Sequence, residues 1–250
     1  MVANTCAPYK KKLGSVSMRK PAATSHRGVT RQAVAEAAAE LVATDGLEAL
    51  SVRQVANRLG VWPTTVMHHA GGRRDGLVAL LIEHLAAGIR TEPHGSWRAR
   101  LAELGREIRG VALAHRGLAD VLLRSGATGP QALRLADAIL DALQDAGLDE
   151  DDAQDAYDVF LTYVLGSAGR QTTAVAPARW RSFAQALDQA EPDAYPALRR
   201  AARGGNTRDD DARFTGGLDL VLDAIAARAS RSGGRANHPR RSGRASRGHP

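Results

Sequence analysis

The sequence predicts an all-α protein with a small N-terminal domain followed by a larger helical domain. Apolar residues recur at helical spacing over much of the chain, which is typical of helices that bury one face. Gly and Pro residues stand at the ends of these runs, where helices stop and start. A length of 250 residues suits one domain of about 50 residues and one larger domain.

The first helix is expected from Thr30 to Thr44, with Gly46 positioned to end it. Its apolar residues form one stripe at i, i+4, i+7 and i+8: Val34, Ala38, Leu41 and Val42.

A second and a third helix follow with only a short turn between them. Ser51 is a typical N-cap residue for the second helix. The apolar stripe of this helix consists of Val52, Val55, Ala56 and Leu59. Gly60 can adopt the left-handed conformation of a sharp turn, and Pro63 is tolerated in the first turn of a new helix. This arrangement predicts a helix-turn-helix, whose second helix enters the major groove of DNA.

The run GLEALSVRQVANRLGVWPTTVMHHAGGRRDGL resembles the N-terminal domain of the TetR family of bacterial transcriptional repressors. The matching positions continue without a gap: Gly46, Leu50, Ser51, Arg53, Val55, Ala56, Leu59, Gly60, Val61, Thr65, His69, Arg73 and Leu77. The resemblance includes the flanking first and fourth helices. It therefore implies three helices and a connecting fourth, which together span residues 29–89.

The resemblance implies a set of DNA-binding residues on and around the third helix, Pro63 to His69. The set is Ser51, Arg53, Pro63, Thr64, Thr65, Met67, His68, His69 and Arg73. Arg53 is the candidate for contacting guanine, and Arg73 for contacting phosphate at a helix N-terminus. The two threonines suit phosphate or a thymine methyl group, and the Pro63 ring suits the methyl group. Val66 is expected to face inward, and one of the two histidines to pack while the other contacts phosphate.

Four residues depart from the family pattern in this region. Met67 stands where a tyrosine is usual, and Trp62 where a polar residue is usual. Ala70 replaces a larger apolar residue. Gly76 replaces a leucine, which predicts a fourth helix weaker by roughly 1 kcal/mol than one with Ala. These departures leave the fold intact, but the operator sequence and the binding strength of the family do not carry over to this chain.

The net charge of +7 comes from the two ends of the chain. Residues 1–28 carry six Lys or Arg residues and no acid, and so do residues 231–250. Removing these 12 from the 34 basic residues leaves 22 against 27 acidic residues, so the middle has a net charge of −5. We expect disordered basic tails at 1–28 and 230–250. They either contact phosphates or only increase solubility.

The larger domain is expected to span residues 96–229. Helices are predicted over 97–115, 130–146, the run from 148 to 170, and Phe214 to Arg228, with a looser stretch through 177–212. Three of its segments resemble the C-terminal domain of the tetracycline-repressor subgroup: WRARLAELGREIRGVALAHRGLADVLL, DAYDVFLTYVLG and FTGGLDLVLDAIAAR. That domain forms a ligand pocket and a four-helix dimer interface. The resemblance assigns the interface to residues 149–170 and 213–229, although burial within one chain would also explain these apolar helices.

The candidate pocket residues are mainly apolar. They are His84, Ile89, Leu104, Ile108, His115, Leu122 and Thr162. Apolar residues replace the pocket histidines of the subgroup, so the metal-binding set is missing and a tetracycline–magnesium complex is not expected to bind. The pattern favours an apolar small molecule, with His84 and His115 as candidate polar anchors. A filled core without any ligand would produce the same pattern.

Other function classes are less well supported. No catalytic constellation or cofactor motif is recognisable, so an enzyme is not expected. The single cysteine, Cys6, excludes a disulfide within the chain, and no apolar run approaches a membrane span of ~18 residues. We therefore expect a cytoplasmic, homodimeric repressor that leaves a palindromic operator when a mainly apolar ligand binds. A ligand-independent regulator, an activator of the same family and a nonspecific basic nucleoid protein are the alternatives.

Overall fold

The computed structural model describes residues 28–92, 94–172, 175–191, 193–203 and 209–236, and within these ranges all regular structure is helical. The expected tails lie outside the described residues over 1–27 and 237–250. The helices that correspond to the predicted N-terminal domain are α1 (Arg31–Asp45), the short 3-10 helix η1 (Leu47–Ala49), α2 (Val52–Leu59), α3 (Pro63–His69) and α4 (Arg74–Ala87). The larger domain contains α5 (Trp97–Ala114), α6 (Leu118–Ser125), α7 (Pro130–Asp145), α8 (Glu150–Thr172), α9 (Val175–Asp188), α10 (Pro196–Arg203) and α11 (Asp210–Ala236).

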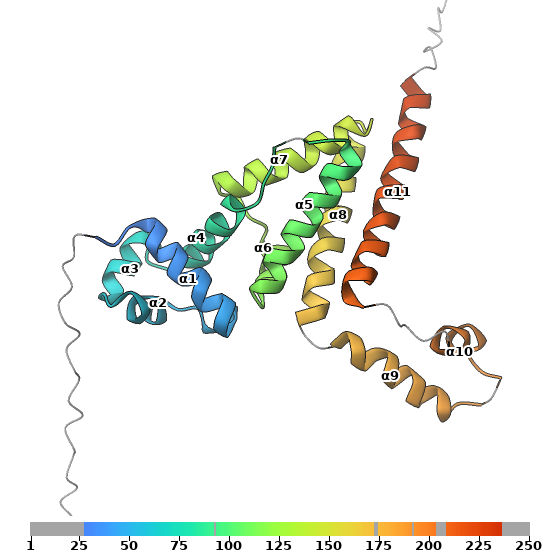
Figure 1. Cartoon of the computed structure of the whole chain (residues 1–250), viewed down its shortest axis with the longest axis horizontal. Coiled ribbons are helices and arrows are strands. Elements are labelled where there is room, and N and C mark those ends of the chain that lie inside the picture. Colours follow the sequence, from blue (N-terminus) through green and yellow to red (C-terminus); the bar gives the residue numbers. More distant parts are fainter. Residues whose placement is uncertain (1–27, 93, 173–174, 192, 204–208, 237–250) are drawn as a thin grey trace, which may run out of the picture.

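The first three helices form a small bundle at one end of the molecule, and α4 connects this bundle to the rest (Figure 1). The predicted bounds of α3 are confirmed, and α1 and α2 begin within one residue of the expected positions. The Thr30 side chain accepts a hydrogen bond from the Ala33 amide, and the Ser51 hydroxyl accepts one from the Gln54 amide, so both helices are capped by side chains. The inward-facing stripes of α1 and α2 meet α4 in one core, in which Val34, Val55 and Leu77 are fully buried.

Gly76 has a packing role that the sequence did not reveal. A Cβ atom at this position would lie 1.9 Å from the backbone carbonyl oxygen of Ala70. The end of α3 therefore approaches α4 so closely that only glycine fits in the first turn of α4. The expectation that Gly76 weakens the fourth helix leaves this contact out: a larger residue would lose the close packing of the two helices.

The larger domain is built around α8, which packs against α5, α6, α7 and α11. Phe160 on α8 is fully buried and lies against Gly105 on α5, where an added Cβ would be 3.3 Å from the ring. Acidic residues occupy the first turn of α8, where they favour the positive end of the helix dipole. Figure 1 shows α8 and α11 side by side along one flank of the domain.

Two parts of the larger domain differ from the sequence prediction. Helices α9 and α10 occupy most of the stretch expected to be loose. Their prolines, Pro177 and Pro196, lie in first turns, where proline is tolerated, so they start helices rather than break them. Arg199 on α10 donates hydrogen bonds to carbonyl oxygens at the end of α9 and just after it, which stabilises this pair.

Helix α11 is longer at both ends than predicted. It begins at Asp210, where the Asp209 carboxylate accepts a hydrogen bond from the Ala212 amide as an N-cap. It continues to Ala236, so the expected start of a disordered tail at residue 230 is wrong for residues 230–236. The segment reads SRSGGRA, and its Ser and Gly residues disfavour a helix, so composition placed the end of the helix before it.

None of the helices in the described part of the chain is long and apolar enough to cross a membrane.

Candidate nucleic-acid interface and apolar cavity

The turn between α2 and α3 is fixed by local backbone geometry. Gly60 adopts the left-handed conformation, with φ of 67° and ψ of 29°, and the Val61 amide donates to the Ala56 carbonyl oxygen at 3.0 Å. Trp62 is extended, and Pro63 follows as the first residue of α3. The chain therefore reverses sharply and presents α3 on the outside of the bundle, as the glycine and the proline predicted.

The orientation of α3 agrees with the sequence prediction. Val66 is fully buried under the helix, whereas Pro63, Thr64, Met67 and His68 are exposed. Two large side chains stand out from this surface, since Trp62 is 55% exposed and Met67 is 41% exposed. Thr65 is half-buried at the edge. A row of hydroxyl, imidazole and apolar groups thus faces solvent along one side of a short helix.

The two adjacent histidines have different environments. His69 is half-buried, and its Nε2 atom lies 3.1 Å from the Val29 carbonyl oxygen, so it connects the end of α3 to the segment before α1. His68 is exposed and meets the His69 ring edge-on at 5.4 Å between centroids. His68 is therefore the histidine that is available to a ligand, and His69 is held in the fold.

The remaining candidate residues lie at helix starts around α3. Arg53 is exposed in the first turn of α2, and Arg73 is exposed at the N-cap of α4. The Ser51 hydroxyl is occupied by its capping hydrogen bond. The neighbouring Arg74 is instead structural, because its guanidinium donates to the carbonyl oxygens of Leu50 and Leu47 at 3.2 and 2.9 Å.

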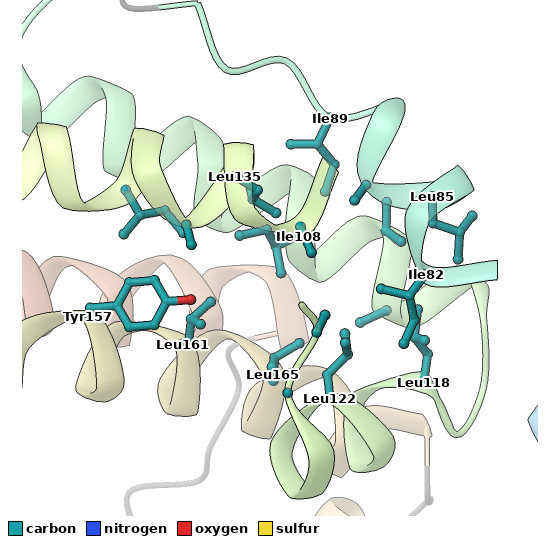
Figure 2. A pocket seen from close by; sticks show the side chains of 18 residues that line it. Ile82, Leu85, Ile89, Ile108, Leu118, Leu122, Leu135, Tyr157, Leu161 and Leu165 are labelled. Atoms are coloured by element: carbon teal, nitrogen blue, oxygen red, sulfur yellow. The ribbon is translucent and has the colours of Figure 1, made fainter. Parts of the chain in front are cut away.

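A cavity of about 130 Å³ lies between α4, α5, α6, α7 and α8 (Figure 2). Three of the seven candidate pocket residues line it: Ile89, Ile108 and Leu122. The sequence did not single out the other lining residues, among them Ile82 and Leu85 of α4, Leu118 of α6, Leu135 and Ile139 of α7, and Tyr157, Leu161 and Leu165 of α8.

The other four candidates do not line this cavity. Leu104 is one helical turn away from Ile108 along α5 and is buried in the core. Thr162 is exposed, because it follows Leu161 and so points away from the cavity. His115 is buried after the end of α5, where its Nδ1 atom lies 2.8 Å from the Val111 carbonyl oxygen. His84 is half-buried on α4 outside the cavity. Neither histidine is therefore a polar anchor of this cavity.

Tyr157 contributes the single polar side chain among the described residues that line the cavity. Figure 2 shows its hydroxyl oxygen directed toward the space between α8 and the helices opposite. Burial and the nearby Asp158 carboxylate raise the pKa of the Tyr157 hydroxyl above its usual value, with burial as the larger cause. The hydroxyl is therefore a neutral hydrogen-bonding group at ordinary pH.

Helices α4 and α7 are tied together beside the cavity. The Glu83 carboxylate of α4 accepts hydrogen bonds from the Gln131 and Ala132 amides at 2.9 and 3.1 Å, so it caps α7. In return, Arg134 of α7 donates to the carbonyl oxygens of Ala86 and Ile89 at the end of α4, at 3.2 and 3.1 Å. We call this pair of contacts the reciprocal cap; it fixes the end of each helix to the other.

A second connection joins the small bundle to the larger domain. Arg116, between α5 and α6, donates to the Asp45 carbonyl oxygen at 2.9 Å, and its own carbonyl oxygen accepts from the Leu47 amide at 2.9 Å. The guanidinium lies where a side chain at Gly46 would be, 2.9 Å from the added Cβ. The end of α1 is therefore in direct contact with the start of α6.

Within the described ranges, no cluster of three or more His, Cys, Asp or Glu residues is arranged to hold a metal ion.

An exposed recognition helix on a helix-turn-helix, joined to a helical domain with an apolar cavity, defines a DNA-binding regulator rather than an enzyme. Comparison with known proteins agrees. Residues 34–80 match the family described as bacterial regulatory proteins, tetR family, and residues 91–229 match the tetracyclin repressor-like C-terminal domain. The chain belongs to the TetR family of transcriptional regulators.

Individual relatives cover most of the chain. An HTH-type transcriptional regulator from Saccharopolyspora erythraea is 29% identical over 214 residues, which is 80% of this chain and 86% of the relative. The class C tetracycline repressor from Escherichia coli is 30% identical and covers 78% of this chain and 90% of its own. A third relative is the TetR family protein ActR from Streptomyces coelicolor, in its crystal structure in complex with actinorhodin. Its sequence is 26% identical to this chain. It superposes with a TM-score of 0.71 over 81% of this chain and 99% of its own.

Proposed function

We propose that this protein is a homodimeric repressor that binds a palindromic operator through α3 and leaves it when a small, mainly apolar ligand occupies the cavity. The position of α4 carries the proposal. Its N-terminal turn packs against the end of α3 at Gly76, and its C-terminal half contributes Ile82, Leu85 and Ala86 to the cavity wall. A displacement of this wall is therefore transmitted to the DNA-binding bundle by a single helix.

The contact between Arg116 and the end of α1 supports the same coupling by a second route. Leu118, two residues after Arg116, is buried and lines the cavity. A ligand that moves the start of α6 would therefore act on Asp45 and Leu47 as well as on α4. Such a ligand lowers DNA affinity only to the extent that it binds the released arrangement more tightly than the DNA-bound one.

For DNA recognition we assign direct base contacts to α3 and the start of α2. Arg53 is exposed, and its guanidinium can donate two hydrogen bonds to the O6 and N7 atoms of a guanine. Thr64 and the Pro63 ring suit thymine methyl groups, and Thr65 suits phosphate. Arg73 and His68 are exposed at a helix N-terminus and at the end of α3, where they suit the sugar–phosphate backbone.

Two arguments support a dimer. One recognition helix contacts few bases, and α8 and α11 expose large apolar side chains. A recognition helix of seven residues contacts few bases, whereas two such helices about 34–36 Å apart recognise a palindrome. Helices α8 and α11 pack side by side, and large apolar side chains on them face solvent in the single chain: Val159 is 57% exposed and Leu220 is 71% exposed. A four-helix contact between two copies would cover these side chains, in agreement with the expected interface at 149–170 and 213–229.

A ligand for the cavity is supported by its apolar lining and by the relative ActR, whose complex with actinorhodin is a small-molecule complex. The filled-core alternative is disfavoured by the cavity volume of about 130 Å³, because ordinary cores leave few voids larger than a water molecule.

A mobility-shift assay on the DNA that flanks the protein's own gene tests the proposal. Arg53→Ala should weaken binding to the specific fragment by about 5- to 150-fold, since a good bidentate base contact is worth about 1–3 kcal/mol. The matched control is Arg106→Ala, which removes an exposed arginine on α5, and should bind as the wild type does. Equal binding by all three proteins would contradict the assignment of α2 and α3.

Three further experiments separate the alternatives: binding by a shortened chain, release by apolar compounds, and transcription after deletion of the protein. A nonspecific basic protein would bind any duplex equally and lose this binding when the chain is shortened to residues 28–236. A ligand-independent regulator would bind its operator specifically, and no apolar compound that occupies the cavity would release it. An activator would show the same binding, with transcription of the neighbouring gene falling rather than rising when the protein is deleted.

A further inference from the structure

We propose that the cavity selects a neutral molecule with one ring-sized apolar part and one hydrogen-bond acceptor, and that the Tyr157 hydroxyl is the group that recognises this acceptor. The proposal rests on the proposed function in taking the cavity as the ligand site, and it goes further in naming the chemical class of ligand and the residue that determines specificity.

The lining of the cavity excludes charged ligands. Apart from Tyr157, the described lining residues are Gly, Ala, Val, Leu and Ile, whose side chains provide neither charge nor a hydrogen-bonding group. An ionised carboxylate would lose its hydration here and gain only the Tyr157 hydroxyl as a partner, and an ammonium group would gain no charged partner, which is strongly unfavourable for both. A neutral molecule loses much less on entry.

The Tyr157 hydroxyl is available to a ligand. No hydrogen-bond partner for it is found in the described part of the chain, although the residue is half-buried on α8. The hydroxyl points into the cavity in Figure 2, and its raised pKa keeps it protonated, so it acts as a donor. A half-buried donor at the cavity wall favours a ligand that brings an acceptor, such as a ketone, ether or hydroxyl oxygen.

Tyr163, also on α8, has a structural role and provides a comparison for Tyr157. Its hydroxyl donates to the Phe214 carbonyl oxygen at 2.8 Å, and its ring stacks on Phe214 at 5.8 Å between centroids. Gly217 leaves the space that the hydroxyl occupies. Tyr163 is therefore engaged between α8 and α11, whereas the hydroxyl of Tyr157 is directed into the cavity.

The volume limits the size of the enclosed part of the ligand. The cavity of about 130 Å³ is comparable to an engineered apolar cavity of about 150 Å³ that takes up benzene. The enclosed part is therefore about one six-membered ring, with the acceptor placed at its Tyr157 end.

Three probes of similar size test the inference on the full-length protein: acetophenone, which carries one acceptor, ethylbenzene, which carries none, and benzoate, which is charged. Dissociation constants are measured by NMR titration for wild type, Tyr157→Phe and the matched control Tyr163→Phe. We expect wild type to bind acetophenone about 5-fold more tightly than ethylbenzene, as one added hydrogen bond implies, and benzoate at least 10-fold more weakly than either.

Tyr157→Phe should remove the preference for acetophenone and leave ethylbenzene binding within 2-fold of wild type. Tyr163→Phe should keep the preference, since its hydroxyl is already engaged. An unchanged preference in Tyr157→Phe overturns the role of Tyr157, and benzoate binding as tight as that of acetophenone overturns the neutral class. Failure of all three probes to bind overturns the inference entirely.

The failure of this inference is distinguishable from the failure of the proposed function. Binding of the probes with the expected preference, without any effect on operator affinity, would uphold the inference and contradict ligand-controlled repression. Release from the operator by a charged compound would uphold ligand-controlled repression and contradict the inference of a neutral ligand.

Discussion

The substitution Gly76→Ala separates two opposing effects on stability. Helix propensity alone predicts a gain of up to about 1 kcal/mol, because Ala is favoured over Gly in helices. The added Cβ, however, would lie 1.9 Å from the Ala70 carbonyl oxygen, far inside contact distance, and the obstacle is backbone rather than a flexible side chain. Overpacking typically costs about 1–3 kcal/mol, which exceeds the propensity gain, so we expect a net loss of up to about 2 kcal/mol.

Urea-induced unfolding at equal protein concentrations measures this change in the free energy of unfolding. The matched control is Gly110→Ala on α5, where an added Cβ meets no atom within 4 Å and the side chain would be exposed. This control should gain about 0.5–1 kcal/mol. Because relief of the clash moves the end of α3, Gly76→Ala should also weaken operator binding. The reasoning would be refuted if Gly76→Ala gained as much stability as Gly110→Ala.

Three further predictions concern the cavity and its surroundings. Glu83→Ala removes the cap of two α7 amides and should cost about 1 kcal/mol in urea unfolding, while Glu83→Gln, which keeps an acceptor, should lose less. Arg116→Ala removes the hydrogen bond to the Asp45 carbonyl oxygen. It should leave specific operator binding intact but reduce the effect of a cavity ligand on that binding in a mobility-shift titration. The raised pKa of Tyr157 contributes stability that is complete below about pH 10 and is lost as the pH rises through the folded-state pKa. The fall in Tm above pH 10 should therefore be shallower in Tyr157→Phe, as measured by circular dichroism; an identical slope would contradict it.

The helix-turn-helix was predictable because its determinants are local. Ser51 caps a helix wherever it precedes an amphipathic run, and the positive φ of Gly60 needs no distant partner. The inward position of Val66 follows from the helical period alone. The sequence therefore predicted both the limits of α3 and the side that faces solvent.

The cavity was predicted less well, because its lining depends on how five helices pack. Ile108 and Leu104 lie four residues apart and look equivalent in a helical pattern, yet the cavity ends between them. Tyr157, Leu161 and Leu165 follow the same spacing and resemble an ordinary core stripe. Only tertiary packing reveals that they line a cavity, that Thr162 is exposed, and that the His115 ring is engaged by the backbone of its own helix.

The reciprocal cap between α4 and α7 has a mechanical consequence. Two helices whose ends are fixed to each other by Glu83 and Arg134 tilt together rather than slide apart. Helix α4 has 14 residues and is therefore about 21 Å long, and its C-terminal half lies at the cavity. A tilt of about 5° about the end of α4 at the cavity would displace its other end, and α3 with it, by about 2 Å. In the proposed mechanism this is how a ligand in the cavity would change the position of α3 relative to the base edges.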